Sequence, residues 1–291
     1  MRALVYDGFN SVSLREKPFP LLASPTDAIV KVTKTTICGT DLHIRKSDVA
    51  TCQPGRTLGH EGAEHVRIPH ADSSLYPIPD GADDDDAALV MLSDVFPTGL
   101  ECGVLNGKVQ PGGTVVIVGS GPVGLAAVIT AQMYSPSQVV AIEVDVKRLE
   151  VARRLGATDT INSAETDAVA QVKALTEGKG ADAVIEAVGV PATFDLCQSL
   201  LAPGGVLANV GVHGTKVDLH LQNLWDKNIA ITTRLVDTTT TPMLLKLVQS
   251  GKLKPSLLIT HHFKLGDVEK AYETFGDASK HGTLKVVINV D

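Results

Sequence analysis

The chain has 291 residues, of which 44% are hydrophobic and 20% are charged, and its formal net charge is -7. At roughly 150 residues per domain this length predicts two domains, and the apolar content excludes wholesale disorder. The sequence has no basic stripe, which argues against a nucleic-acid partner, and no apolar run long enough to cross a bilayer. The N-terminus lacks the apolar core of a signal peptide. We therefore expect a cytoplasmic protein without a membrane partner.

Four cysteines are spread along the chain without a Cys-x-x-Cys pair, at Cys38, Cys52, Cys102 and Cys197. This spacing argues against a disulfide framework and against a site built from several thiolates. Cys102 and Cys197 fall in apolar helical contexts, so we expect them to pack as small hydrophobic side chains.

The first hundred residues are rich in short β-type runs, and the chain then changes character at Gly113. From there apolar strand-like runs alternate with helix-like runs, which is typical of a parallel, doubly wound sheet in an α/β protein. The predicted strands are 114–119, 138–143, 181–189, 206–212 and 229–236, and the predicted helices are 125–134, 146–156 and 192–201.

After Thr241 the pattern changes again. We expect a helix over 241–255, a strand over 258–265, an amphipathic helix over 268–275 and a last strand over 283–290. The composition places domain boundaries near Pro97 and near Thr241.

A glycine-rich motif lies directly between a predicted buried strand and a predicted helix. Gly119, Gly121 and Gly124 have the G-x-G-x-x-G spacing, with Pro122 and Val123 between the last two glycines. The first glycine permits a tight turn, the second lets the backbone approach a pyrophosphate, and the third allows close helix–strand packing. Both the spacing and the strand–helix context therefore predict a dinucleotide site.

Glu143 ends the next predicted strand, nineteen positions after Gly124. An acid at this point accepts hydrogen bonds from the adenosine ribose 2'-hydroxyl, and its charge repels a 2'-phosphate. We therefore expect NAD rather than NADP.

Two further motifs carry residues that can bind a metal. The segment CGTDLH spans residues 38–43, and GHEG spans residues 59–62. Taken separately, Cys38 is a buried thiol and His60 a turn histidine. Together with SDVFPTGLECG (93–103) and VIVGSGPVGLAA (116–127), however, the motifs resemble the zinc-dependent alcohol dehydrogenases of the medium-chain dehydrogenase/reductase superfamily.

The resemblance implies a GroES-like catalytic domain and a Rossmann NAD-binding domain. It assigns residues 1–96 to the catalytic domain, 97–241 to the Rossmann domain, and 242–291 to a segment that returns to the catalytic domain. It also implies one catalytic zinc ion with Cys38, His60 and Asp94 as ligands and Glu61 as a carboxylate that coordinates transiently. Thr40 and His43 match the residues that relay the alcohol proton.

The same resemblance assigns further contacts to the cofactor. Many family members have an arginine directly after the first zinc ligand, where this chain has Gly39, so one phosphate contact is absent. The positions that match cofactor contacts are Thr98, Val123, Arg148, Val188, Val210, Val212 and Lys285.

The chain departs from the family after Gly62. There Ala63 and Glu64 join directly to a segment that family members reach only after several dozen further residues. Those residues include the lobe of four cysteines that holds a structural zinc, so we expect no structural zinc here. They also include barrel strands and part of the alcohol pocket, so we expect open strand edges and a wider substrate site.

The leading functional hypothesis is an NAD- and zinc-dependent enzyme that interconverts primary or secondary alcohols and their aldehydes or ketones by hydride transfer. One alternative is a catalytically impaired NAD(H)-binding protein that has lost its alcohol pocket. Another is a reductase of specialised metabolism that acts on a bulky carbonyl or iminium substrate. The resemblance also implies a homo-oligomer, paired through the sheet edge near residues 229–236.

The remaining histidines and the single tryptophan have no assigned role. Trp225 follows an amphipathic run, which predicts that it packs. We interpret as surface or turn residues the scattered histidines His213, His220, His261, His262 and His281.

Overall fold

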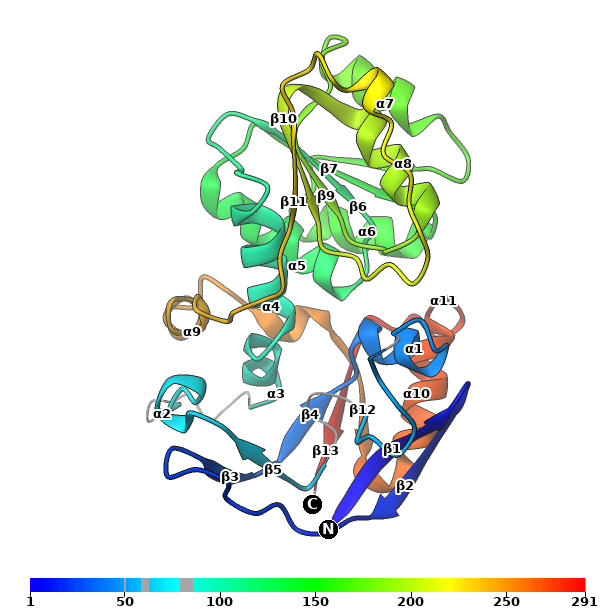
Figure 1. Ribbon diagram of the computed structural model, residues 1–291. Helices are drawn as coiled ribbons and strands as arrows, with labels where there is room; N and C mark the ends of the chain where they lie inside the picture. Colours follow the sequence, from blue (N-terminus) through cyan, green and yellow to red (C-terminus); the bar gives the residue numbers. More distant parts are fainter. Residues whose placement is uncertain (50, 59–62, 79–85, 291) are drawn as a thin grey trace. The chain divides into compact units, whose positions relative to one another are not determined.

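The computed structural model describes residues 1–49, 51–58, 63–78 and 86–290, and the chain forms two compact units (Figure 1). Unit 1 consists of Met1–Met91 and Thr241–Asp291, and unit 2 consists of Leu92–Thr240. The sequence placed the first boundary near Pro97, but helix α4 (Val95–Pro97) packs against helix α5 of unit 2. Asp94 therefore belongs to unit 2 rather than to unit 1.

Unit 2 is built on a parallel sheet that, within the described residues, has six strands in the order β11-β10-β9-β6-β7-β8. Strands β6 and β9 are neighbours in this sheet although two other strands separate them in the sequence. The strand order therefore reverses between them, which is the point where α/β sheets bind ligands. The strands are β6 (Thr114–Val118), β7 (Gln138–Glu143), β8 (Asp159–Asn162), β9 (Ala181–Glu186), β10 (Leu201–Asn209) and β11 (Ala230–Thr233).

Helices cover both faces of this sheet (Figure 1). They are the π-helix η3 (Thr98–Leu105), α5 (Pro122–Ala131), α6 (Val146–Arg154), α7 (Ala168–Leu175) and α8 (Pro191–Leu200). Helices α7 and α8 bury Val172 and Cys197 against one face, where Val116 and Val184 point. On the opposite face η3 and α5 meet the sheet beside Ile185. Because successive strand residues point to opposite faces, Val184 packs against the α7 and α8 layer and Ile185 against the η3 and α5 layer.

Strand β8 and helix α7 were not predicted from the sequence. Strand β8 is only four residues long and contains Asp159, Thr160 and Asn162, so it lacks the apolar run that marks the other strands. Helix α7 does carry a start signal, because the Asp167 carboxylate accepts a hydrogen bond from the Ala170 N–H at 3.0 Å.

The described residues of unit 1 form three small sheets. Their strand orders are β1-β2, β3-β5 and β12-β13-β4, and β13 pairs in parallel with β12 and antiparallel with β4. The strands are β1 (Arg2–Gly8), β2 (Ser11–Glu16), β3 (Ala28–Lys31), β4 (Lys34–Thr36), β5 (His65–Ile68), β12 (Ile259–Lys264) and β13 (Lys285–Asn289). The helices are α1 (Gly39–Arg45), α2 (Ala71–Ser74), α3 (Asp86–Leu89), α9 (Thr241–Gln249), α10 (Val268–Gly276) and α11 (Ala278–His281).

Helix α10 anchors the core of unit 1. Its buried residues Val268, Ala271, Tyr272 and Phe275 are spaced as one face of an α-helix, as the sequence pattern predicted. This face packs on a cluster that includes Leu4 of β1 and two residues of β13. The C-terminal segment therefore completes the core that the N-terminal strands begin.

Trp225 does not pack, and that expectation was wrong: its side chain is 78% exposed, in the connection before β11. Strand β11 lies at the end of the sheet order in unit 2. No helix among the described residues is both long and apolar enough to cross a membrane.

The close fit between η3 and α5 yields a stability prediction. A Cβ atom on Gly99 would lie 2.8 Å from the Ala127 nitrogen and 2.9 Å from the Ala126 Cβ. We expect Gly99→Ala to lower the free energy of unfolding by about 1–3 kcal/mol, because overpacking forces the two helices apart. Gly266→Ala is the matched control, since a Cβ there meets nothing within 4 Å. Thermal unfolding measures both, and equal midpoints for the two variants would contradict the prediction.

Candidate functional site

The glycine motif forms a tight loop between β6 and α5. Gly119 adopts the left-handed backbone conformation, with a φ of 97°. A Cβ atom on Gly124 would collide with the Gly119 carbonyl oxygen, so the third glycine is required for the helix to pack against the turn. Gly121 is different, because a Cβ there would meet nothing within 4 Å.

The open space at Gly121 lies at the start of a ten-residue helix. Gly121 is the N-cap of α5, Pro122 occupies the first helical position, and Val123 follows in the first turn. The first N–H groups of a helix lack intrahelical partners and carry partial positive charge, so this end can receive a phosphate group. The open space at Gly121 therefore lets a pyrophosphate approach the loop backbone.

Glu143 lies beside this loop at the end of β7. One oxygen of its carboxylate accepts a hydrogen bond from the Ser120 N–H at 2.8 Å, and the other accepts one from the Val144 N–H at 2.8 Å. The Arg148 Nη1 atom is 3.9 Å from the first of these oxygens. Both residues assigned to the adenosine ribose are thus neighbours in unit 2, and the carboxylate is fixed by the glycine loop itself.

The next loops along the same edge of the sheet carry three further predicted cofactor contacts. Val188 follows β9, and Val210 and Val212 follow β10. The Val210 N–H donates to the Glu186 carbonyl at 2.8 Å. Val188 and Val212 are each 37% exposed, so the two loops present apolar side chains at the surface of unit 2.

In unit 1, Cys38 immediately precedes helix α1. Its N–H donates to the Asp41 carboxylate at 3.0 Å, and the same carboxylate oxygen accepts a hydrogen bond from the Tyr272 hydroxyl at 3.1 Å. Asp41 is 1% exposed, so this carboxylate fixes the turn from within the core. The buried Asp41 carboxylate thus joins the start of helix α1 to Tyr272 of helix α10.

The two predicted relay residues both lie on α1. Thr40 occupies its first turn and is half-buried. The His43 Nδ1 atom is 3.1 Å from an Asp48 carboxylate oxygen, and the two side chains are 24% and 32% exposed. Asp48 therefore restricts the orientation of the imidazole ring.

The other predicted metal ligands, Asp94, His60 and Glu61, are not found beside Cys38 among the described residues of unit 1. Asp94 lies in unit 2, where its carboxylate accepts a hydrogen bond from the Thr98 hydroxyl at 2.7 Å. His60 and Glu61 fall outside the residues that the structure describes. Among the described residues no three His, Cys, Asp or Glu side chains form a metal-binding cluster. The ligand set stays a prediction.

Lys285 has a partner within unit 1. Its side chain is 2% exposed, and its ammonium group donates to the Ile37 carbonyl oxygen at 2.7 Å. Ile37 directly precedes Cys38, so Lys285 braces the strand end from which the Cys38 turn departs. The pyrophosphate contact expected of Lys285 stays a prediction.

The sequence analysis did not identify two residues that lie beside the predicted cofactor loops of unit 2. Glu186 ends β9 and is fully buried, and His213 follows β10 with its side chain 15% exposed. His213 lies in the loop after β10, but its ring also belongs to a polar network with Glu186 and Asn209, which the sequence did not reveal. An acidic residue at the end of an apolar strand was the available signal for Glu186.

The buried thiols behave as packed hydrophobic groups. Burial raises the pKa of Cys102 to about 11, and burial together with the Glu186 charge raises the pKa of Cys197 well above its usual value. Both cysteines are therefore protonated near neutral pH and poor nucleophiles or ligands. Cys38 and Cys52 are only partly buried.

Comparison with known proteins agrees with this architecture. The family model described as zinc-binding dehydrogenase matches residues 122–250. A zinc-dependent alcohol dehydrogenase 2 from Streptococcus pneumonia has a solved structure that is 43% identical, with a TM-score of 0.93, and the match covers 100% of this chain and 99% of that chain. The alcohol dehydrogenase TADH from Thermus sp. ATN1 is 27% identical with a TM-score of 0.89, over 100% of both chains. An alcohol dehydrogenase of Cupriavidus necator is 29% identical over 365 aligned positions, covering 99% of this chain and 98% of that relative.

Proposed function

The chain belongs to the zinc-type alcohol dehydrogenases of the medium-chain dehydrogenase/reductase superfamily, and on that premise we propose that it uses NAD and one catalytic zinc ion to interconvert alcohols and carbonyl compounds. Family membership makes the chain an oxidoreductase. The observation that carries the cofactor part is the open loop at Gly121, which is adjoined by the Glu143 carboxylate. When bound, zinc polarises the substrate oxygen and the nicotinamide ring exchanges a hydride with the substrate carbon.

The proposed zinc ligands are Cys38, His60 and Asp94, with Glu61 as a transient fourth. A thiolate, an imidazole and a carboxylate are ligands that zinc accepts, and three protein ligands leave one position for substrate. The hydrogen bond that the Cys38 N–H donates to the Asp41 carboxylate supports this assignment, because it fixes the turn that presents the thiol. Thr98 plays the corresponding part for Asp94 by donating to its carboxylate.

The relay residues move the alcohol proton. We assign Thr40 to hold the substrate hydroxyl and His43 to pass the proton toward solvent. The contact between His43 Nδ1 and Asp48 supports this role, because a carboxylate that pairs with one ring nitrogen orients the ring. Asp48 itself is one-third exposed, so protons can exchange with water there.

NAD is the proposed cofactor because of charge at the ribose end. The Glu143 carboxylate is 10% exposed and is held by two backbone N–H groups, so it cannot readily swing away from a 2'-phosphate. Repulsion between the two anions then disfavours NADP. We assign the nicotinamide end to Thr98, Val123, Val188, Val210 and Val212, and a pyrophosphate contact to Lys285.

We also propose that the catalytic domain is a shortened one without a structural zinc. The alignment with the Cupriavidus necator relative runs over 365 positions, more than the 291 residues of this chain. The division of unit 1 into separate small sheets supports the same interpretation. The barrel strands that this proposal omits would also line the alcohol pocket, so bulkier alcohols should lose less activity than ethanol-sized ones.

The family match does not favour the two alternatives, an impaired NAD(H)-binding protein or a reductase for bulky carbonyl or iminium substrates. Pairing into a homo-oligomer stays a proposal, with β11 at the sheet edge as the candidate contact.

The zinc assignment predicts a protection pattern for the four thiols. Zinc should bind at one ion per chain and slow the alkylation of Cys38, because a metal-bound thiolate is not free to react. Cys52 is the internal control, since it is also only partly buried and should react equally with and without zinc. Cys102 and Cys197 should stay unreactive in both states. Mass spectrometry after a timed iodoacetamide pulse measures this pattern, and metal analysis counts the zinc.

Two tightly bound zinc ions per chain would contradict the shortened catalytic domain. Loss of zinc from Cys38→Ser with unchanged NADH binding would support the assignment, whereas zinc retained at full stoichiometry in that variant would refute it.

The cofactor assignment predicts a preference that depends on Glu143. With a panel of small and bulky alcohols, the zinc-loaded protein should show a kcat/KM for NAD at least about tenfold above that for NADP. Glu143→Gln should narrow this ratio, because the amide keeps an acceptor for the ribose hydroxyl but loses the repulsive charge. Absorbance of the reduced nicotinamide follows both reactions. Equal use of the two cofactors by the unmodified protein would overturn the assignment.

Gly121 offers a binding test that is independent of turnover. Its backbone is compatible with alanine, since its φ is -71° and a Cβ meets nothing within 4 Å. Gly121→Ala should therefore leave the unfolding temperature unchanged but raise the Kd for NADH about tenfold or more, because the methyl group fills the space proposed for the pyrophosphate. Titration calorimetry measures the Kd. An unchanged Kd would show that the dinucleotide does not lie on this loop.

A further inference from the structure

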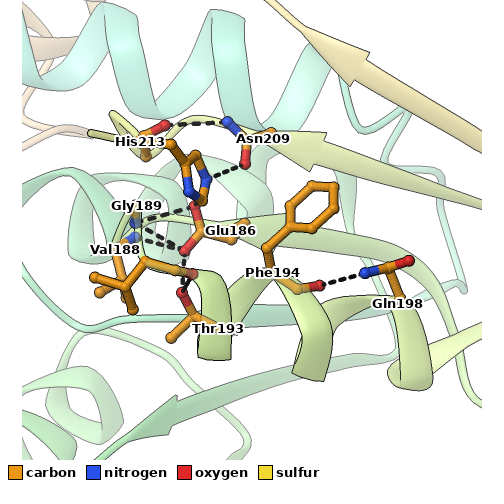
Figure 2. A network of polar contacts seen from close by, with 10 residues as sticks. Glu186, Val188, Gly189, Thr193, Phe194, Gln198, Asn209 and His213 are labelled. Carbon is orange, nitrogen blue, oxygen red and sulfur yellow. Dashed lines mark hydrogen bonds and ion pairs between the residues drawn. The ribbon is translucent and has the colours of Figure 1, made fainter. Parts of the chain in front are cut away.

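Glu186 is a carboxylate that is fully buried at the end of β9. One of its oxygens accepts hydrogen bonds from the Val188 N–H at 3.0 Å, the Gly189 N–H at 2.9 Å and the Thr193 hydroxyl at 2.6 Å (Figure 2). Burying a charge is costly unless hydrogen bonds compensate it, and here the donors come from the loop after β9 and the first turn of α8. The side chain therefore fixes the whole segment from residue 187 to residue 193.

The same residue also holds the loop after β10. The Glu186 carbonyl accepts hydrogen bonds from the Val210 N–H at 2.8 Å and the Gly211 N–H at 3.0 Å. Its second carboxylate oxygen lies 3.5 Å from His213 Nε2. A Cβ on Gly211 would collide with this carboxylate oxygen. Glu186 thus contacts the two loops with its backbone and its side chain at once.

The hydrogen bonds around His213 define which ring nitrogen carries a proton. The Asn209 amide nitrogen donates to the Gly211 carbonyl at 3.0 Å, so the Asn209 side-chain oxygen faces His213 as an acceptor. That oxygen is 2.8 Å from His213 Nε2, which therefore carries the proton. The proton on Nε2 gives this side of the ring a positive partial charge beside Glu186, and Phe194 packs edge-on against the ring at 5.8 Å.

The network holds two apolar side chains at the surface. Val188 and Val212 are each 37% exposed, and a Cβ on Gly189 would collide with the Val212 backbone, so the loops that carry them are in direct contact. We infer that Glu186 is a positioning residue that sets these two loops for the nicotinamide end of the dinucleotide. This inference rests on the proposed function, which assigns Val188, Val210 and Val212 to that end.

The test compares two ligands that differ only at the nicotinamide end. ADP-ribose contains the adenosine and the pyrophosphate but lacks the ring, whereas NADH contains all three. We expect Glu186→Gln to raise the Kd for NADH about tenfold, because the neutral amide weakens the charge-assisted hydrogen bonds to both loops. The Kd for ADP-ribose should change by less than about twofold, because the Gly121 loop and Glu143 do not depend on that charge. Titration calorimetry on the full-length chain measures both constants.

Glu101→Gln is the matched control. Glu101 is the other fully buried glutamate of unit 2, and its carboxylate accepts hydrogen bonds from the Asp237 and Thr240 backbones at 3.1 and 2.8 Å. Its substitution should lower the unfolding temperature while leaving the ratio of the two Kd values unchanged. Thr193→Val removes only the hydroxyl that donates to Glu186 and keeps the side-chain shape. It replaces Glu186→Gln in the test if that variant does not fold. We expect it to raise the Kd for NADH about threefold.

A selective loss of NADH affinity in Glu186→Gln or in Thr193→Val supports the inference. Equal losses for NADH and ADP-ribose, or no loss for NADH, would overturn it. If the unmodified chain bound neither ligand, the proposed function would fail and this inference with it, so the two failures are distinguishable.

Discussion

Close backbone contact among three consecutive loops is the constraint on which the cofactor half of the molecule depends. The loops follow β6, β9 and β10 at the carboxyl edge of one parallel sheet. A Cβ on Gly119 would collide with Val188, and one on Gly189 would collide with the Val212 backbone. Side chains at these glycines would separate the loops, so the surface they form exists only because each loop contributes a residue without a Cβ.

Glu186 supplies the hydrogen bonds that hold the loops together. The glycines only permit the loops to approach closely, because they lack side chains. Backbone N–H groups that meet at the edge of a sheet need acceptors, and an unpaired buried donor is costly. The buried carboxylate provides the acceptors for Val188 and Gly189, and its carbonyl provides one for Val210. These hydrogen bonds fix the two loops, while the Val188 and Val212 side chains stay 37% exposed.

The sequence predicted the Rossmann half well because its signals are local. The run 114–118 is apolar throughout and Gly119, Gly121 and Gly124 follow at a fixed spacing, so neighbouring residues alone identify strand, turn and helix. Glu143 could be found because its distance from Gly124 is set by one helix and one strand. The contact between Glu186 and His213 could not be found, since it joins two loops that only the sheet order brings together. Trp225 was misjudged because amphipathic spacing does not reveal whether a partner covers the apolar face.

The Cys38 turn shows why a shortened catalytic domain can keep a metal ligand in place. Two contacts brace this turn, the Tyr272 hydroxyl on the Asp41 carboxylate and the Lys285 ammonium on the Ile37 carbonyl. Both donors come from the C-terminal segment, more than two hundred residues further along the chain. Neither comes from the region after Gly62 where the proposed deletion lies. Loss of barrel strands there removes pocket walls, but the hydrogen bonds that fix Cys38 are formed by residues that the chain retains.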